Sequence, residues 1–109
     1  MPTIYKVLGQ SAPSATTDTT LYTVPAATST VVSTIVVANR DSTSATFRIA
    51  IRPAGATLAN QHYVAFDCSV GANDSTALTL GLTLAATDVV TVRASSANLT
   101  FNAYGSEIS

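Results

Sequence analysis

The stretch that most constrains the fold runs from Leu21 to Gly55 and reads LYTVPAATSTVVSTIVVANRDSTSATFRIAIRPAG. It consists almost entirely of Thr, Ser, Ala, Val and Ile, and it contains no Glu, Lys, His or Cys. β-Branched side chains fit the pleated, half-buried surface of a strand better than a helix. The stretch therefore predicts a β-protein with few groups capable of chemistry.

Apolar residues alternate with polar ones elsewhere in the chain, which is typical of strands with one buried and one solvated face. The residues expected to share a buried face within a strand are Phe47, Ile49 and Ile51; Leu78, Leu80, Leu82 and Leu84; Val90 and Val92; and Leu99, Phe101 and Ala103. Residues 29–39 have β-branched side chains on both sides, which predicts a central strand covered on both faces. In QHYVAFDCSV, the pattern places His62, Val64, Phe66 and Cys68 on one face, and Tyr63 and Ala65 on the other.

Turn-forming residues separate these segments at intervals of about 8–12 residues, which is typical of a sandwich. We predict an all-β fold for residues 1–109: a single-domain antiparallel β-sandwich of about eight strands. A jelly roll is equally compatible with the pattern. Within residues 1–20, Ile4 to Leu8 predicts a short strand, and GQSAPSATTDTT (Gly9 to Thr20) predicts a loop or an extended arm. Deletion of Met1 to Thr20 is expected to leave the sandwich folded.

The sequence indicates no catalytic, metal or cofactor site. His62 is the one histidine and Cys68 the one cysteine, too few for a zinc site. We interpret His62 as a strand residue at a sheet edge or an interface, and Cys68 as a small buried residue. Asn73-Asp74-Ser75 is the one weak calcium candidate, and we interpret it as a turn. The prediction is a protein that is not an enzyme.

Charge is scarce, at 10% of residues against about 25% in typical soluble domains. Five basic residues and a pI near 5.5 argue against a nucleic-acid partner. The longest apolar run, Ile35 to Ala38, is too short for a membrane span, and the N-terminus has no pattern of a signal peptide. A surface with so little charge suits a protein that is covered by copies of itself or by a larger assembly.

Arg48 and Arg52 lie four residues apart and therefore share one strand face. That face is expected either to hold acidic residues of a neighbouring subunit or to be simply solvated. Tyr63 and Tyr104 are expected either to stack on a sugar or to pack structurally. The candidate assembly contacts are Ile4, Tyr5, Leu8, Arg48, Arg52, Tyr63 and Tyr104.

The series YKVLGQ, LYTVPAATSTVVSTIVVANR, FRIAIRPAGA, QHYVAFD, LTLGLTLAATDVVTV and FNAYGSEI resembles small virion structural proteins of tailed bacteriophages, cyanophages above all. The resemblance extends from Ile4 to Ile108. It implies a non-enzymatic place in the virion, synthesis in the bacterial cytoplasm and no catalytic motif.

The function expected on these grounds is that of a head decoration or cement protein. It would dock as a homo-oligomer, plausibly a trimer, on the major capsid protein, with residues 1–20 as the contacting arm. Two alternatives stay open: a neck, tail, baseplate or fibre-associated protein, and a host-receptor or carbohydrate-binding sandwich module.

Overall fold

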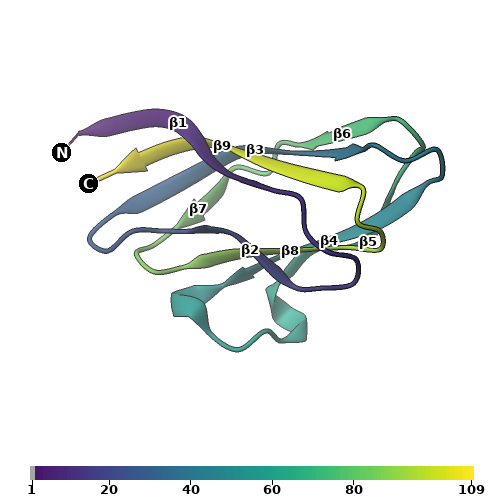
Figure 1. Ribbon diagram of the computed structural model, residues 1–109. Coiled ribbons are helices and arrows are strands. Elements are labelled where there is room, and N and C mark those ends of the chain that lie inside the picture. Colours follow the sequence, from purple (N-terminus) through teal and green to yellow (C-terminus); the bar gives the residue numbers. More distant parts are fainter. Residues whose placement is uncertain (1) are drawn as a thin grey trace.

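The computed structural model describes residues 2–109, which form two antiparallel sheets packed face to face (Figure 1). The first sheet has the order β1 (Thr3–Ser11), β9 (Leu99–Ile108) and β3 (Ser29–Asn39), with β6 (Ser75–Leu78) and β7 (Leu82–Leu84) both paired to β3. The second sheet has the order β2 (Thr19–Thr23), β8 (Val89–Ala94), β4 (Ala45–Arg52) and β5 (Tyr63–Val70). Two short 3₁₀ turns, η1 (Pro53–Gly55) and η2 (Asn60–His62), lie between β4 and β5.

The connectivity is that of a jelly roll. The chain passes from one sheet to the other at nearly every connection, and β6 and β7 together occupy one edge position of the first sheet. With β6 and β7 taken as one, each sheet has four antiparallel positions, as in the double Greek key of this fold. The prediction of an all-β sandwich is confirmed, and the strand order selects its jelly-roll form.

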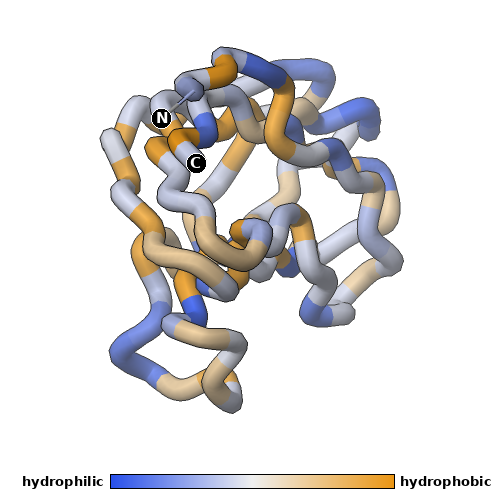
Figure 2. The backbone as a smooth tube through the Cα atoms, turned by 90° about the vertical axis from the view of Figure 1, so that its left-hand side faces the viewer, coloured by the Kyte–Doolittle hydropathy of each residue, from blue (hydrophilic) through white to orange (hydrophobic). Residues whose placement is uncertain are grey.

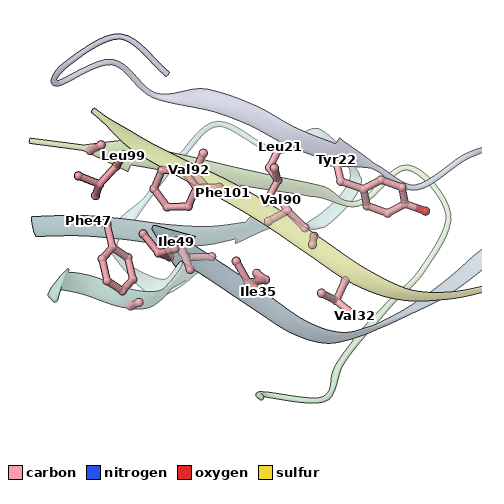
Figure 3. Close-up of a cluster of buried hydrophobic side chains, with 14 of the residues drawn as sticks. Leu21, Tyr22, Val32, Ile35, Phe47, Ile49, Val90, Val92, Leu99 and Phe101 are labelled. Atoms are coloured by element: carbon pink, nitrogen blue, oxygen red, sulfur yellow. The ribbon is translucent and has the colours of Figure 1, made fainter. Parts of the chain in front are cut away.

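The core is the layer of apolar side chains between the two sheets (Figure 3). Phe47 of β4 and Phe101 of β9 meet edge to face across this layer, with ring centroids 6.2 Å apart. Both rings are almost fully buried, and burying a side chain of this size contributes about 1.5–3 kcal/mol. Figure 2 shows short hydrophobic stretches alternating with hydrophilic ones along the whole chain, because each strand contributes only every second residue to the core.

Glycine is required where two backbones approach closely. A Cβ atom on Gly105 of β9 would lie 1.9 Å from the carbonyl oxygen of Val31, and one on Gly9 of β1 would lie 2.2 Å from that of Leu21. The first contact falls beside a bulge of β3 at Ser33, and the second falls where β1 passes from the first sheet towards β2. Both glycines therefore allow local backbone approaches that any other residue would prevent.

Three predictions about strand faces need correction. Residues 78–84 do not form one strand, because the chain leaves β3 at Thr79–Gly81 and Gly81 adopts a φ of +61°. The central strand β3 is covered on one face only, since its burial alternates along its length. In β5, Asp67 adopts a φ of +52° in an irregular part of the register, so Phe66 faces solvent while Cys68 packs against the core.

The N-terminal segment is more structured than the sequence indicates. The predicted strand at Ile4–Leu8 is confirmed, but it continues to Ser11 and pairs with β9 throughout. Of the predicted arm, only residues 12–18 lie outside strands, as the connection between β1 and β2. Within this connection, Ala15 forms a β-bridge with Ala94. Deletion of residues 1–20 would remove an edge strand and the start of β2, so the segment is an integral part of the sandwich. Met1 lies outside the described residues.

Asn39 joins the two sheets at one end of the core. It is the last residue of β3, and its side chain is buried. The amide nitrogen lies within hydrogen-bond distance of the carbonyl oxygens of Thr43, Val70 and Gly71, at 2.9–3.3 Å. The amide oxygen accepts a hydrogen bond from the backbone N–H of Asp41 at 2.9 Å. One buried side chain thus binds backbone groups of two loops and the buried end of β5 at Val70.

We expect Asn39→Ala to lower the free energy of unfolding by about 2–4 kcal/mol, because the substitution removes a buried side chain and all of its hydrogen bonds to two loops and to β5. Chemical denaturation followed by circular dichroism measures this change. Asn60→Ala, at an exposed position of η2, serves as the control and should change stability by less than about 0.5 kcal/mol. Equal effects of the two substitutions would contradict this role of Asn39.

Candidate interaction surfaces

The outer face of the first sheet carries no charged residue within the described part of the chain. Strand registers and alternation place the following residues on it: Tyr5, Val7 and Gln10 of β1; Thr100, Asn102, Tyr104 and Ser106 of β9; Val31, Thr34, Val36 and Ala38 of β3; Ser75 and Ala77 of β6; and Thr83 of β7. We call this surface the uncharged face. It consists of small hydroxyl and aliphatic side chains, with two tyrosines at its β1 side.

Exposed apolar side chains gather at the β1 end of the uncharged face. Tyr5 is 84% exposed and Val7 is 48% exposed, and Val7 lies directly opposite Tyr104 of β9. Ile4 of the same strand is 53% exposed on the other side of the sheet. Large apolar side chains with this exposure on one strand mark a surface suited to contact with another molecule.

A buried polar cluster lies beneath this edge and joins the two sheets. The hydroxyl of Tyr22 in β2 donates to Glu107 of β9, and Thr30 of β3 donates to the Tyr22 oxygen at 2.8 Å. Lys6 of β1 pairs with the same carboxylate at 3.2 Å. Burial, with the hydrogen bond to Glu107, raises the pKa of Tyr22 to about 12, and the Tyr22 hydroxyl lowers the pKa of Glu107 below its ordinary value.

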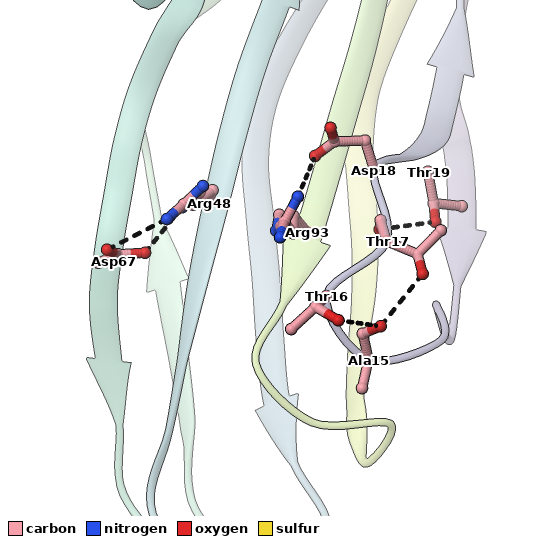
Figure 4. Close-up of polar contacts among 8 residues, drawn as sticks. All are labelled: Ala15, Thr16, Thr17, Asp18, Thr19, Arg48, Asp67 and Arg93. Carbon is pink, nitrogen blue, oxygen red and sulfur yellow. Dashed lines mark hydrogen bonds and ion pairs between the residues drawn. The ribbon is translucent and has the colours of Figure 1, made fainter.

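The outer face of the second sheet is charged. Arg48 of β4 and Arg93 of β8 lie directly opposite each other in the register, and two like charges in this position would repel. Each turns to its own carboxylate (Figure 4): Arg48 Nε donates to Asp67 at 2.7 Å, and Arg93 Nη1 lies 3.7 Å from Asp18. The hydrogen bond from Arg48 lowers the pKa of Asp67, so the pair stays ionised at neutral pH.

A shallow depression of about 300 Å³ opens between these two ion pairs. Arg48, Asp67, Arg93, Thr16, Thr46 and Ser95 supply its polar lining. Phe66 lies next to it: the Arg48 guanidinium stands 4.0 Å from its ring centroid, and Tyr63 packs edge-on at 4.9 Å. The depression therefore combines hydrogen-bond donors, acceptors and a nearby exposed aromatic ring.

The structure separates the assembly contacts expected from the sequence into two groups. Ile4, Tyr5 and Tyr104 lie at the β1 end of the first sheet, with Leu8 half-buried against the core, whereas Arg48, Arg52 and Tyr63 lie on the second sheet. Tyr63 and Tyr104, the two candidates for stacking on a sugar, are thus on opposite faces of the molecule and cannot act in one binding site.

Arg52 has a local role in the second sheet. Its Nε donates to Thr91 at 3.0 Å, and its Nη1 donates to the carbonyl oxygen of Ala56 at 3.1 Å. Sequence reasoning missed Val7, Phe66 and Arg93. Alternation alone already placed Val7 beside Tyr5 on β1, but the exposure of Phe66 depends on the bulge at Asp67.

The prediction that His62 is a strand residue is wrong, because this histidine lies in a turn. His62 ends η2, where its Nδ1 accepts a hydrogen bond from the backbone N–H of Ala59 at 3.0 Å, because the chain closes a short turn before β5. Between Pro2 and Ser109, no group of three or more His, Cys, Asp or Glu side chains is placed to hold a metal ion. Over the same residues, no helix has the length and hydrophobicity needed to cross a membrane.

No protein-family model matches the chain, and no curated protein is significantly similar to it. Three features of the structure bear on function: the uncharged face, the exposed apolar side chains at its β1 end, and the depression on the second sheet.

We expect the stability of the protein to fall as the pH rises from 10 through about 12. The folded state binds the Tyr22 proton more tightly than the unfolded chain, and this difference in proton affinity stabilises the folded state. The stabilisation is fully present below pH 10, and it is lost as the Tyr22 hydroxyl of the folded protein ionises. Denaturation at pH 9, 10, 11 and 12 measures the effect. Tyr22→Phe is the matched variant, and its stability should fall less over this range; parallel curves would contradict the assignment.

Proposed function

We propose that this chain is a non-enzymatic structural protein of a tailed-bacteriophage virion, a head decoration protein that docks on the assembled capsid. Two observations support the proposal. The sequence resembles small virion structural proteins over nearly its whole length, and one complete face of the sandwich lacks charge. The uncharged face is the observation that carries the assignment.

The physical argument concerns desolvation. Burying a charged side chain in an interface is costly unless it finds a partner, and the cores of protein interfaces are depleted in charge and enriched in aromatic residues. The uncharged face can be covered without that cost, and Tyr5 and Tyr104 supply aromatic contacts at its margin. The charged residues of the second sheet, Arg48, Arg52 and Arg93, would then point away from the capsid and keep the particle surface hydrated.

Docking of this kind stabilises a capsid by linkage. A protein that binds the closed shell and not its loosened form shifts the equilibrium towards the closed shell by an amount that grows with concentration and affinity. A rigid sandwich suits this task, because little conformational entropy is lost when it binds.

We expect Thr34→Glu to weaken binding to undecorated capsids by at least about tenfold, since the new carboxylate lies near the middle of the uncharged face and would be desolvated. Thr46→Glu is the matched control, because Thr46 is also half-buried on a central strand but belongs to the opposite face. Co-sedimentation with capsids measures binding. Equal binding of both variants and the wild type would contradict docking through this face.

The copy number per purified virion, measured by quantitative mass spectrometry against the major capsid protein, decides between the head and the alternatives. Hundreds of copies support a decoration role that follows the capsid lattice. A few dozen or fewer would place the protein in the neck, tail, baseplate or fibres, and complete absence would contradict a virion role.

The depression on the second sheet favours a second candidate function, the binding of a host carbohydrate. Its arginine, carboxylate and hydroxyl groups can bind vicinal sugar hydroxyls, and Phe66 offers a ring for stacking. A glycan array should then give hits for the wild type that are lost in Arg93→Ala and kept in Thr34→Glu. An array without hits would contradict this candidate.

A further inference from the structure

The four edges of the two sheets differ in how they are protected against pairing with another strand. Natural proteins protect edges with very short strands, bulges or charges. The β6/β7 edge is split into strands of four and three residues, β5 carries the irregularity at Asp67, and β2 has five residues with a register shift at Leu21. Among the edge strands of residues 2–109, only β1 offers an unbroken run, from Thr3 to Val7, whose register with its neighbour β9 is regular.

The hydrogen-bonding phase of this run follows from one bond at its start. The backbone N–H of Ser109 donates to the carbonyl oxygen of Pro2 at 3.2 Å, which makes these two residues a hydrogen-bonded pair. Such pairs alternate along an antiparallel ladder, so Ile4 and Lys6 also turn their backbone groups towards β9. The N–H and C=O groups of Thr3, Tyr5 and Val7 consequently point outwards, away from the sheet.

We propose that two copies of this chain pair through antiparallel contact of their β1 strands, with a two-fold axis at Tyr5. In this register Tyr5 pairs with Tyr5 of the second copy, and Thr3 pairs with Val7 in both directions. These are the three residues with outward backbone groups, and two hydrogen bonds for each of the three pairs give six in total. The two first sheets become one continuous sheet, and the two uncharged faces become one surface.

Side chains on both faces fit this pairing. On the uncharged face the two Tyr5 rings lie side by side, and Val7 and Tyr104 of each copy flank them, so apolar side chains that are exposed in one copy become covered. On the opposite face Lys6 lies across from Ile4 of the second copy and never across from a like charge. The charge of Lys6 is already matched by Glu107 of its own chain. An antiparallel strand is self-complementary, which favours a second copy as the occupant.

Because the two-fold axis passes through Tyr5, substitutions at this residue test the pairing in a way that distinguishes a lost interface from a folding defect. Wild-type protein should sediment as a dimer in analytical ultracentrifugation, and Tyr5→Glu should raise the dimer dissociation constant by about tenfold or more, because two carboxylates then face each other. Val64→Glu is the control: Val64 is an exposed apolar residue on another edge strand, β5, and this variant should stay dimeric. An equimolar mixture of Tyr5→Glu and Tyr5→Lys should recover a dimer of mixed mass in native mass spectrometry.

A cysteine at the axis tests the register. Residues of a hydrogen-bonded antiparallel pair have Cα atoms about 5.5 Å apart, within the range that a disulfide spans. Tyr5→Cys in a Cys68→Ser background should therefore cross-link on oxidation, whereas Ile4→Cys in that background should not, since the two Ile4 residues are offset by two positions. Cross-linking through Ile4 in place of Tyr5 would overturn the register.

A monomeric or trimeric wild type, or no recovery in the mixture, would overturn the pairing itself. The inference does not rest on the role in the virion. A dimer that fails to bind capsids would contradict only the proposed function, and a monomer that binds them would contradict only the pairing.

Discussion

The sandwich depends on how the ends of its apolar core are closed. Two sheets packed through β-branched side chains leave backbone groups at each end that must find a partner away from water. Asn39 provides the partners at one end of β3, and Tyr22 with Glu107 and Thr30 closes the other end. Between these polar groups the core is held by non-directional packing alone, so they fix how the two sheets lie relative to each other.

The two faces that result are chemically different. Charged side chains on strands are confined to the second sheet, except for Lys6 and Glu107, which pair with each other at the β1 edge. The first sheet is left with small hydroxyl, aliphatic and tyrosine side chains on its outer face. A free monomer gains little from such a face, whereas a protein covered by a shell or by another copy avoids the cost of desolvating charges. The proposed docking follows from this asymmetry, whereas the proposed pairing follows from the regular, unprotected edge of β1.

Several parts of the fold could be predicted because their pattern was clean. Phe47, Ile49 and Ile51 in β4, and Leu99, Phe101 and Ala103 in β9, alternate without interruption, and all six face the core. The pattern failed where an irregular residue shifted it. Gly81 ended the run of leucines, and Asp67 turned Phe66 out to solvent. The backbone conformation of Gly81 or Asp67 cannot be predicted from the sequence, because it depends on how the strand pairs with its neighbour.

The candidate sites divide in the same way. Ile4 and Tyr5 were expected contacts because they belong to an apolar strand followed by a predicted flexible loop, and the structure places them at an exposed edge. Arg93 was not singled out, because its position opposite Arg48 arises from the pairing of β4 with β8, two strands that are separated by about forty residues in the chain. Tyr63 and Tyr104 were both expected to be exposed and were therefore candidates for stacking on a sugar, yet they lie on opposite faces.

The sequence by itself determined the class of fold, the scarcity of charge and the absence of converging catalytic motifs, since these depend on composition and on a period of two that each strand carries within itself. Only the tertiary structure decided the jelly-roll order, the position of Arg48, Arg52 and Arg93 on one sheet, and the outward backbone groups of Thr3, Tyr5 and Val7. These features depend on which distant strands become neighbours and in what register, and that choice is made by packing of the whole core rather than by any local run of residues.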